Sequence, residues 1–374
     1  CVSAKIYDVA IVGAGIIGGA IAWELARAGL RVALLDRQQA GMEASWAAAG
    51  MLAPGAETPD SVPVAPLGRV SLALYPEFVA GIEADSGGSV EFEPGDALQV
   101  FFGEAAERES EAFLTLHREL GMRGEVIAPD LARKLEPQVS EQARVPVLCE
   151  GEARVNGRAL TAVVLAAAQR RGAELRAGTA VTQLGIAQGR VTGVLTASGA
   201  IAAGRVVIAA GCWSGELEQV AQYAPTRPVR GQMVAVRSEL APLRHVLRSH
   251  SGYIVPRADG RLICGSTAEP EAGFEKRVTP EGQQRILAAA IELVPALADA
   301  NVVEAWSGLR PDTPDHLPSL GPTDIEGLLI ATGHYRNGLL LAPITARLLR
   351  EWVIEGRTVS FAAEPLSPMR FGSK

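Results

Sequence analysis

The chain has 374 residues, 48% of them hydrophobic, and a formal net charge of −7. At roughly 100–200 residues per domain this length predicts two domains, and the acidic balance argues against nucleic acid, which needs a basic surface. The apolar runs fall far short of the ~20 residues that cross a membrane, and no signal peptide is evident. We therefore expect a cytoplasmic protein that binds neither nucleic acid nor a membrane.

The four cysteines and five histidines show no spacing typical of a metal site or a hydrolase. Cys1, Cys149, Cys212 and Cys264 form no CxxC pair. The histidines form no HExxH motif, and no GxSxG turn accompanies them. Three of the cysteines lie in apolar stretches, where they are expected to be buried. The sequence thus predicts no metal centre, and it favours a reducing compartment.

The first part of the chain predicts a strand–helix–strand unit. Residues 6–12 (IYDVAIV) form a continuous apolar run, which is typical of a strand buried in a parallel sheet. Residues 16–28 carry apolar side chains at helical spacing, and Gly29 is placed to end that helix. The second strand is expected at residues 31–35.

A glycine turn, GAGIIG at residues 13–18, joins the first strand to the helix. Gly13 permits a tight turn, Gly15 lets the backbone approach a diphosphate, and Gly18 lets the helix pack on the strand. The N–H groups and the dipole at the helix N-terminus attract that diphosphate. Asp36 ends the second strand, where an acid suits a ribose hydroxyl. The unit therefore predicts a dinucleotide site, and by itself it fits FAD and NAD equally.

Further along the chain, helical spacing of apolar residues alternates with short apolar runs typical of strands. Helices are expected at residues 67–84, 104–120, 158–171 and 280–293. Strands are expected at residues 98–102, 181–184, 191–196 and 205–210, within a β-rich stretch at 229–267, and at 302–306. Residues 328–349 predict a strand, a glycine turn and a helix.

Two segments favour FAD over NAD. Residues 44–51 (ASWAAAGM) are small, so that a flat ring could lie against their backbone. Residues 332–343 (TGHYRNGLLLAP) place glycines in a strand-to-helix turn, which offers a second helix N-terminus to a ring carbonyl. An NAD dehydrogenase usually binds its cofactor within one contiguous domain and does not need this closing element.

The sequence predicts an α/β fold (α+β overall) with a Rossmann-like FAD-binding domain assembled from discontinuous segments and a second, mixed-sheet domain for the substrate. We expect the FAD-binding domain to comprise residues 1–85, 150–222 and 313–374. The substrate-binding domain is expected at residues 86–149 and 223–312.

Several stretches resemble the D-amino-acid-oxidase-like flavoproteins, and most closely the glycine oxidases of bacterial thiamine biosynthesis. They are IVGAGIIGGAIAWELARAG, SWAAAGMLAPGAE, AAGCWSG, GYIVPRADGRLICGST, WSGLRPDTPD and ATGHYRNGLLLAPITA. The resemblance implies oxidation of a small amino acid to an imine, which water hydrolyses to an oxo acid and ammonia or an amine, while O2 is reduced to H2O2. It also implies a homo-oligomer, because this family often forms homotetramers.

The resemblance implies a substrate site as well. Arg310 of GLRP would bind the substrate carboxylate, because a guanidinium pairs with it through two parallel hydrogen bonds. Tyr253 of YIVPR would add a directional hydrogen bond, and Arg336 of HYRNG a donor near the substrate or the ring. Hydride passes to the flavin, so no strong protein acid or base is required. His334 is accordingly expected to be structural.

Two positions depart from the family pattern. Ser251 stands where glycine oxidases carry histidine, with His250 one residue earlier, and Ala268 replaces an expected methionine. We expect both to line the pocket with Met51. The substrate is thus left open among glycine, sarcosine, another N-substituted glycine, D-alanine and D-proline. The covalent flavin cysteine of sarcosine oxidases has no counterpart near the C-terminus, so FAD is expected to be non-covalent.

The cofactor-binding residues implied by these motifs are Gly13, Gly15, Ile16, Ile17, Gly18, Asp36, Arg37, Ala44, Ser45, Ala48, Ala49, Gly50, Met51, Val181, Gly211, Trp213, Gly308, Arg310, His334, Tyr335, Arg336, Asn337, Gly338, Leu339 and Leu340. Three alternatives stay open: an amino-acid dehydrogenase that reduces an acceptor other than oxygen, a nucleotide-binding redox sensor without turnover, and an NAD(P)-dependent dehydrogenase.

Overall fold

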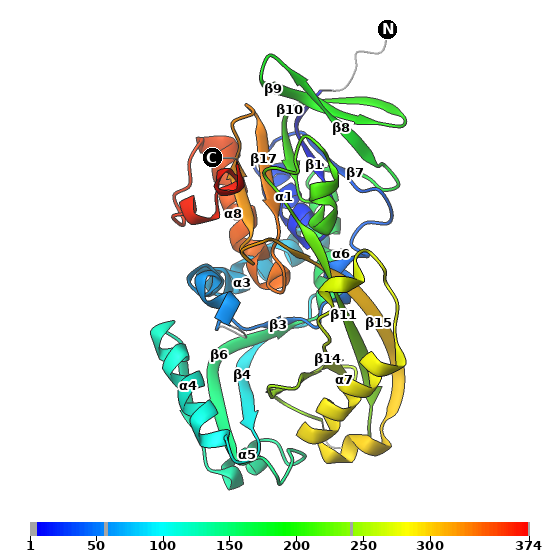
Figure 1. The fold of residues 1–374 in the computed structure, drawn as a ribbon. Coiled ribbons are helices and arrows are strands. Elements are labelled where there is room, and N and C mark those ends of the chain that lie inside the picture. Colours follow the sequence, from blue (N-terminus) through cyan, green and yellow to red (C-terminus); the bar gives the residue numbers. More distant parts are fainter. Residues whose placement is uncertain (1–5, 56–58, 240–241, 373–374) are drawn as a thin grey trace.

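The computed structural model describes residues 6–55, 59–239 and 242–372; Cys1 lies outside them. Two mixed sheets and their covering helices make up the fold, one sheet in the upper half of Figure 1 and one in the lower half. This arrangement confirms the predicted α/β fold with a nucleotide-type sheet and a second, mixed sheet.

The upper sheet is the predicted parallel sheet with one antiparallel edge. Within the described residues it has eight strands, and its main path runs β16-β17-β10-β1-β2-β7. The strands are β1 (Tyr7–Val12), β2 (Val32–Leu35), β7 (Glu174–Arg176), β8 (Val181–Ala187), β9 (Arg190–Thr196), β10 (Gly199–Ile208), β16 (Ser319–Pro322) and β17 (Leu328–Thr332). Neighbours from β17 to β7 are parallel, whereas β16 and the β8–β9 ribbon pair antiparallel. The carboxyl ends of β1, β2, β10 and β17 therefore meet at one edge.

Helices cover this sheet because each presents a wide apolar face. They are α1 (Ile16–Arg27), α3 (Ala65–Ser86), α6 (Gly157–Arg170) and α8 (Gly338–Glu355). α1 packs between α6 and α8, and α3 contacts the same two helices. Ile11 of β1, Ile21 of α1 and Ile344 of α8 lie together in the largest buried apolar cluster.

The lower sheet is curved and carries the rest of the strands. Within the described residues it has nine, with the main path β15-β11-β14-β13-β12-β4-β6-β3, and β5 beside β6. The strands are β3 (Met51–Leu52), β4 (Phe92–Phe101), β5 (Arg123–Val126), β6 (Val145–Val155), β11 (Arg227–Arg237), β12 (Val246–Arg248), β13 (Tyr253–Pro256), β14 (Arg261–Gly265) and β15 (Asn301–Asp312). α4 (Ala106–Glu119) and α5 (Pro129–Leu135) lie at one end, and α7 (Pro280–Leu293) lies at the other (Figure 1).

The strands of each sheet come from separated stretches of the chain, as the interleaved prediction requires. The predicted domain boundaries stay a prediction: β6 runs across the one at residues 149 and 150, and β3 joins the lower sheet. β15 extends well beyond the expected residues 302–306 because it pairs with β11 along almost its whole length.

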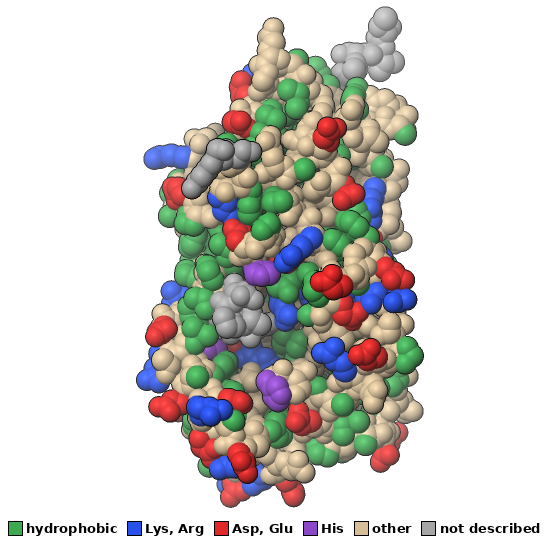
Figure 2. Space-filling view, viewed as in Figure 1, with side chains coloured by type: hydrophobic (Ala, Val, Ile, Leu, Met, Phe, Trp, Pro, Cys, Tyr) green, Lys and Arg blue, Asp and Glu red, His purple; other side chains and the backbone are tan. Residues whose placement is uncertain are grey.

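The helices and the surface relate to two further expectations, that the chain does not cross a membrane and that it has no basic surface for nucleic acid. No helix of the described part of the chain is long and apolar enough to cross a membrane. On the face shown in Figure 2, Lys and Arg side chains are interspersed with Asp and Glu and do not gather into one basic patch.

The glycine turn packs as the sequence predicts. Helix α1 begins at Ile16, and Gly29 follows its end with a φ of 87°. A Cβ on Gly18 would lie 1.8 Å from the carbonyl oxygen of Gly13. The helix and the strand thus touch backbone to backbone, and any side chain at Gly18 would force them apart.

This contact predicts different effects for two neighbouring substitutions. Gly18→Ala should lower the free energy of unfolding by about 3 kcal/mol, because the methyl group meets backbone that has no room to move. Gly19→Ala is the matched control: its methyl would lie 3.1 Å from the side-chain ends of Val164 and Leu165, which can shift slightly, and alanine is the better helix former. Thermal unfolding with saturating FAD measures both, and equal stability of the two variants would contradict the packing.

Candidate active site

One deep cavity opens between the two sheets. Its volume is about 500 Å³, within the roughly 300–1,000 Å³ of small-molecule sites. The carboxyl ends of β1, β2, β10 and β17 form one wall, the short helix α2 (Ala44–Ala47) and residues 48–51 form another, and β11, β13 and β15 close the far end. A ligand in this cavity would contact both sheets.

The glycine turn forms the nucleotide end of the cavity. Gly13, Gly15, Ile16 and Ile17 all line it. Gly15 is the N-cap of α1 and brings no side chain to this end of the helix. The backbone N–H of Ile16 donates to Ser45 Oγ at 2.9 Å, and that hydroxyl can donate its own proton to a phosphate oxygen. The arrangement suits a diphosphate at a helix N-terminus.

Asp36 lies beside this turn at the end of β2. Its Oδ2 accepts the N–H of Ala14 at 2.9 Å, and its Oδ1 accepts the N–H of Gln38 at 3.0 Å. Burial raises the pKa of Asp36, and the two backbone donors act in the opposite direction. Each carboxylate oxygen has a further lone pair, so the group is oriented to accept a hydrogen bond from a ribose hydroxyl.

The small-residue segment (residues 44–51) packs against the lower sheet. Trp306 Nε1 donates to the carbonyl oxygen of Ala47 at 3.0 Å. A Cβ on Gly308 would lie 2.4 Å from Ala47 Cβ, so only glycine lets β15 approach this closely. Gly50 has a φ of 83°, and a Cβ there would lie 1.8 Å from a β6 carbonyl oxygen. The segment thus offers backbone and methyl groups to a flat ring.

The turn before α8 closes the cavity from the other side. Gly333 and Tyr335 have φ values of 76° and 47°, and α8 begins at Gly338. Tyr75 Oη of α3 donates to the carbonyl oxygen of Leu339 at 2.5 Å, which fixes the first turn of that helix. A second helix N-terminus therefore faces the cavity, as the sequence predicted.

His334 lies in this turn and is almost fully buried. Its Nε2 lies 3.0 Å from Thr345 Oγ1. Burial lowers the pKa of His334 to about 3, so the ring is neutral at physiological pH. This contact supports the structural role expected from the sequence, which stays a prediction.

Arg310 of β15 lies at the far end of the cavity. Its Nη2 donates to Ser266 Oγ at 2.9 Å, and its Nη1 donates to the carbonyl oxygen of Thr267 at 3.1 Å. A Cβ on Gly231 of β11 would lie 2.2 Å from Nη1, so the guanidinium crosses directly over that glycine. The fork of N–H donors is held in one plane, which suits recognition of a carboxylate.

Tyr253, Met51 and Arg336 line the same cavity. Tyr253 Oη donates to the sulfur of Met233 at 3.5 Å. The Arg336 guanidinium carbon lies 5.4 Å from the ring centroid of the preceding Tyr335. The fold thus brings four of the six residues predicted to bind the substrate to one cavity: Tyr253 of β13, Arg310 of β15, Arg336 of the turn before α8, and Met51 of β3.

Most residues of the predicted site lie in the cavity wall. They are Gly13, Gly15, Ile16, Ile17, Asp36, Arg37, Ala44, Ser45, Ala48, Ala49, Gly50, Met51, Val181, Gly211, Trp213, Tyr253, Gly308, Arg310, His334, Tyr335, Arg336, Gly338 and Leu339.

Five predicted residues lie outside that wall: Gly18, Ser251, Ala268, Asn337 and Leu340. Gly18 serves helix packing, Asn337 is the N-cap of α8, and Leu340 is buried in the core. Ser251 and Ala268 are exposed, because each lies in a loop next to its strand. Their expected effect on the pocket stays a prediction.

The comparisons with known proteins agree with this geometry. A sequence profile of the FAD dependent oxidoreductase (DAO) family matches residues 8–352. The chain belongs to this family. The predicted cofactor, FAD, is thereby confirmed.

Relatives within the family include named glycine oxidases. The glycine oxidase of Geobacillus kaustophilus (strain HTA426) is 35% identical, and the match covers 97% of each chain. The crystal structure of glycine oxidase from Geobacillus kaustophilus has a TM-score of 0.91 at 34% identity, covering 98% of this chain and 99% of that chain. The bifunctional protein ThiO/ThiG of Trichormus variabilis is 39% identical over 94% of this chain. The chain spans about half that protein's length (53%).

The residues of the cavity fit FAD. The N-terminus of α1 would hold the diphosphate, and Asp36 would accept from a ribose hydroxyl. The small-residue segment and the turn before α8 would hold the flat ring. A Cβ on Gly13 would meet the carbonyl oxygen of Ala209, and one on Gly50 that of Val155, so both glycines hold the cavity wall together backbone to backbone.

Sequence reasoning missed several cavity residues, among them Glu43, Gly231, Met233 and Ser266. A glycine inside a strand often marks a close approach by another group, so Gly231 within the expected β-rich stretch carried a usable signal. Met233 carried none, because a methionine in an apolar strand is most often a core residue.

The loop before α7 crosses toward the cofactor end of the cavity. Lys276, before α7, pairs with Glu43 at 2.9 Å. The ring of Phe274 lies 5.5 Å from that of Trp213, centroid to centroid, and the Arg37 guanidinium carbon lies 3.7 Å from the Trp213 ring centroid. Arg37, Glu43 and Trp213 line the cavity, so these contacts hold its rim together.

Removing the ion pair should speed the loss of FAD. We expect Lys276→Met to raise the FAD dissociation rate about twofold to fivefold at low salt, since a partly exposed pair contributes up to about 1 kcal/mol. The effect should vanish in about 1 M NaCl, which screens exposed charges. Recovery of flavin fluorescence after dilution measures the rate, and Lys134→Met on α5 is the control. Equal rates for the two variants at low salt would contradict the role of this contact.

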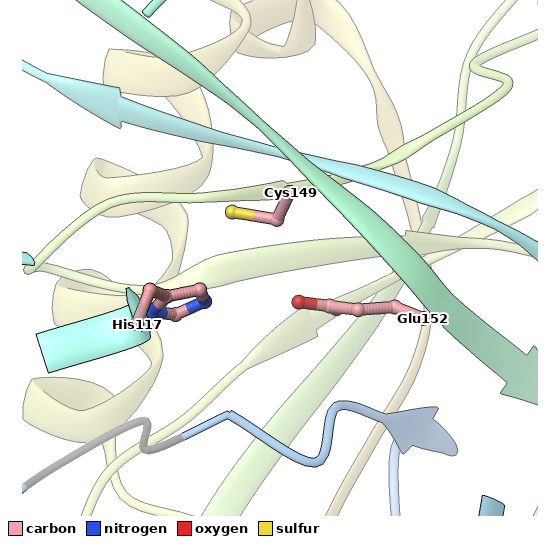
Figure 3. A group of neighbouring side chains, drawn as sticks. All are labelled: His117, Cys149 and Glu152. Atoms are coloured by element: carbon pink, nitrogen blue, oxygen red, sulfur yellow. The ribbon is translucent and has the colours of Figure 1, made fainter. Parts of the chain in front are cut away.

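A second group of polar side chains lies away from the cavity. Figure 3 shows His117 of α4 with Cys149 and Glu152 of β6, all buried, with their ligand-type atoms within 4.8 Å of one another. A register shift in the β4–β6 pairing turns Cys149 and Glu152 toward the same side. Arg248 donates to both oxygens of Glu152, at 3.1 and 2.8 Å. A cation here would meet the guanidinium, so the group favours an ion pair over a metal, and the absence of a metal centre stays a prediction.

His117 gives the fold a dependence on pH. Burial, together with the nearby Arg248, lowers the pKa of His117 to about 4, against about 6.5 in an unfolded chain. The unfolded state therefore takes up the proton first, so stability is present above about pH 6.5 and is lost as the pH falls toward 4.

Replacing the ring should remove this dependence. Between about pH 7 and pH 5 the wild type should lose up to about 2 kcal/mol more stability than His117→Phe, which keeps a flat ring against Phe113. Thermal unfolding at the two pH values measures the difference. Identical pH dependence of the two proteins would show that His117 does not stay neutral in the fold.

Proposed function

We propose that this chain is an FAD-dependent amine oxidase that acts on glycine or a related small or N-substituted amino acid, such as sarcosine, D-alanine or D-proline. As the imine forms, the substrate Cα loses a hydride, which is one hydrogen with two electrons, and the amine loses a proton. Water hydrolyses the imine to an oxo acid and ammonia or an amine, and O2 takes up the two electrons and two protons to become H2O2. The named glycine oxidases among the relatives support this reaction.

The observation that carries the proposal is the position of Arg310. Its guanidinium is fixed by Ser266 and Thr267, and it lines the same cavity as the glycine turn, at the opposite end. A carboxylate bound there would hold an amino acid between the lower sheet and the cofactor. A sensor without turnover has no reason to place an oriented guanidinium at that point.

When bound, FAD supplies the acceptor for the hydride of the substrate Cα. The protein's own part is to position the substrate and to keep water out. Arg310 binds the carboxylate, Tyr253 adds a hydrogen-bonding hydroxyl, and Met51 and Met233 provide apolar walls. The neutral His334 is held by Thr345 and is not poised to exchange a proton with the substrate.

The expectation of non-covalent FAD also has support. Cys212 is the cysteine that lines the cavity within the described residues. Burial raises the pKa of the Cys212 thiol to about 12, so the thiolate that would form a flavin bond is scarce. We retain a cytoplasmic location, a homo-oligomer and the domain boundaries as predictions.

The substrate class is tested by mixing the yellow holoprotein anaerobically with glycine, sarcosine, D-alanine and D-proline. At least one should bleach the flavin, and air should then restore the colour with formation of H2O2. Bleaching followed by slow reoxidation would identify a dehydrogenase with another acceptor. No bleaching with any of the four would refute the proposed substrate class.

Arg310→Met should lower kcat/KM for the preferred substrate by at least about a hundredfold, because a charge-assisted pair of hydrogen bonds is lost. Arg123→Met is the control, since Arg123 is exposed on β5 and pairs with Glu150. Stopped-flow flavin reduction measures the effect on the chemical step. An unchanged rate of flavin reduction in Arg310→Met would show that Arg310 does not bind the substrate carboxylate.

A further inference from the structure

Three residues form a row across the lower sheet at the amino-acid end of the cavity. Met233 of β11 pairs with Gly265 of β14, and Gly265 pairs in turn with Tyr253 of β13. Residues directly opposite one another project from the same face of a sheet. The row therefore presents a methionine, a gap and a tyrosine to the cavity.

The gap is closed by the two side chains beside it. A Cβ on Gly265 would lie 2.6 Å from Tyr253 Oη and 2.8 Å from Met233 Cε. The tyrosine hydroxyl donates to the methionine sulfur at 3.5 Å. Met233 is only 3% exposed, yet it lines the cavity. Methionine and tyrosine thus meet over the glycine and form one continuous wall, which we call the Met–Tyr wall (Met233 and Tyr253).

The Met–Tyr wall stands next to the carboxylate site. The Arg310 guanidinium crosses over Gly231, which precedes Met233 by two residues on β11 and so faces the same side. Ser266, which accepts from Arg310 at 2.9 Å, directly follows Gly265. A carboxylate on Arg310 would therefore place the α-carbon of its amino acid, and whatever that carbon carries, against this wall.

We propose that Met233 sets the width of the amino-acid subsite and limits it to substrates whose α-carbon carries no side chain or a small one. This inference rests on the proposed function. Tyr253 is anchored by its ring and hydroxyl, whereas Met233 ends in an apolar thioether that occupies space without binding charge. Shortening Met233 opens the wall while leaving Arg310, Ser266 and the cofactor end of the cavity in place.

Carboxylates of increasing width test the subsite without turnover. Acetate, propionate and 2-methylpropionate are titrated into the oxidised holoprotein, and binding is followed by the change in flavin absorbance. We expect the wild type to favour acetate and Met233→Ala to shift the ratio of affinities toward 2-methylpropionate by about tenfold or more. Met233→Leu conserves volume and should keep the wild-type order.

Two more variants serve as a control and as a second test of the subsite. Met122→Ala truncates a buried methionine away from the cavity and should leave the order of the carboxylates unchanged; an equal shift there would mean general loosening and would overturn the inference. Met233→Phe should still bind acetate and should no longer bind the wider acids. This variant keeps the test decisive even if Met233→Ala binds FAD poorly. The wild-type order in both Met233→Ala and Met233→Phe would refute the role of Met233.

Turnover separates this inference from the proposed function. In Met233→Ala the ratio of kcat/KM for D-valine to that for glycine should rise at least about tenfold, and in Met233→Leu it should stay within about threefold. If no amino acid reduces the flavin but the carboxylates still respond to Met233, the proposed oxidation is wrong and the width limit stands. If amino acids are oxidised but neither series responds, Met233 has no such role.

Discussion

The fold depends on one close backbone contact, between the glycine turn and the end of β10. A Cβ on Gly13 would lie 2.3 Å from the carbonyl oxygen of Ala209, and one on Gly18 would lie 1.8 Å from the carbonyl oxygen of Gly13. These approaches bring α1 tightly against β1 and β10 and aim its N-terminus at the cavity. A diphosphate site results because the backbone N–H groups there face a ligand rather than a side chain.

The rest of the site is assembled on that contact from segments far apart in the chain. Trp306 and Gly308 of the lower sheet hold the small-residue segment in place, and α3 fixes the start of α8 through Tyr75. A ring lying between these elements would contact residues of both sheets. Neither sheet alone forms a closed site, so the chain passes back and forth between the two sheets.

Local sequence was sufficient to predict the parts of the structure that rest on local chemistry. The glycine turn, α1 and Asp36 follow from residue types at fixed spacing, and Arg310, Tyr253 and Arg336 followed from the family resemblance. Ser251 and Ala268 were expected in the pocket, and both are exposed in loops outside the cavity wall, so their role stays a prediction. Met233 and Ser266 were missed because their position depends on strand register in a sheet, which no short motif encodes.

A crystal structure of the holoprotein with acetate tests the central claim, that one cavity holds FAD at the glycine turn and a carboxylate at Arg310. We expect the diphosphate at Gly13 and Gly15 and the acetate within hydrogen-bond distance of the Arg310 guanidinium, against Met233 and Tyr253. A diphosphate bound elsewhere, or acetate bound away from Arg310, would contradict it.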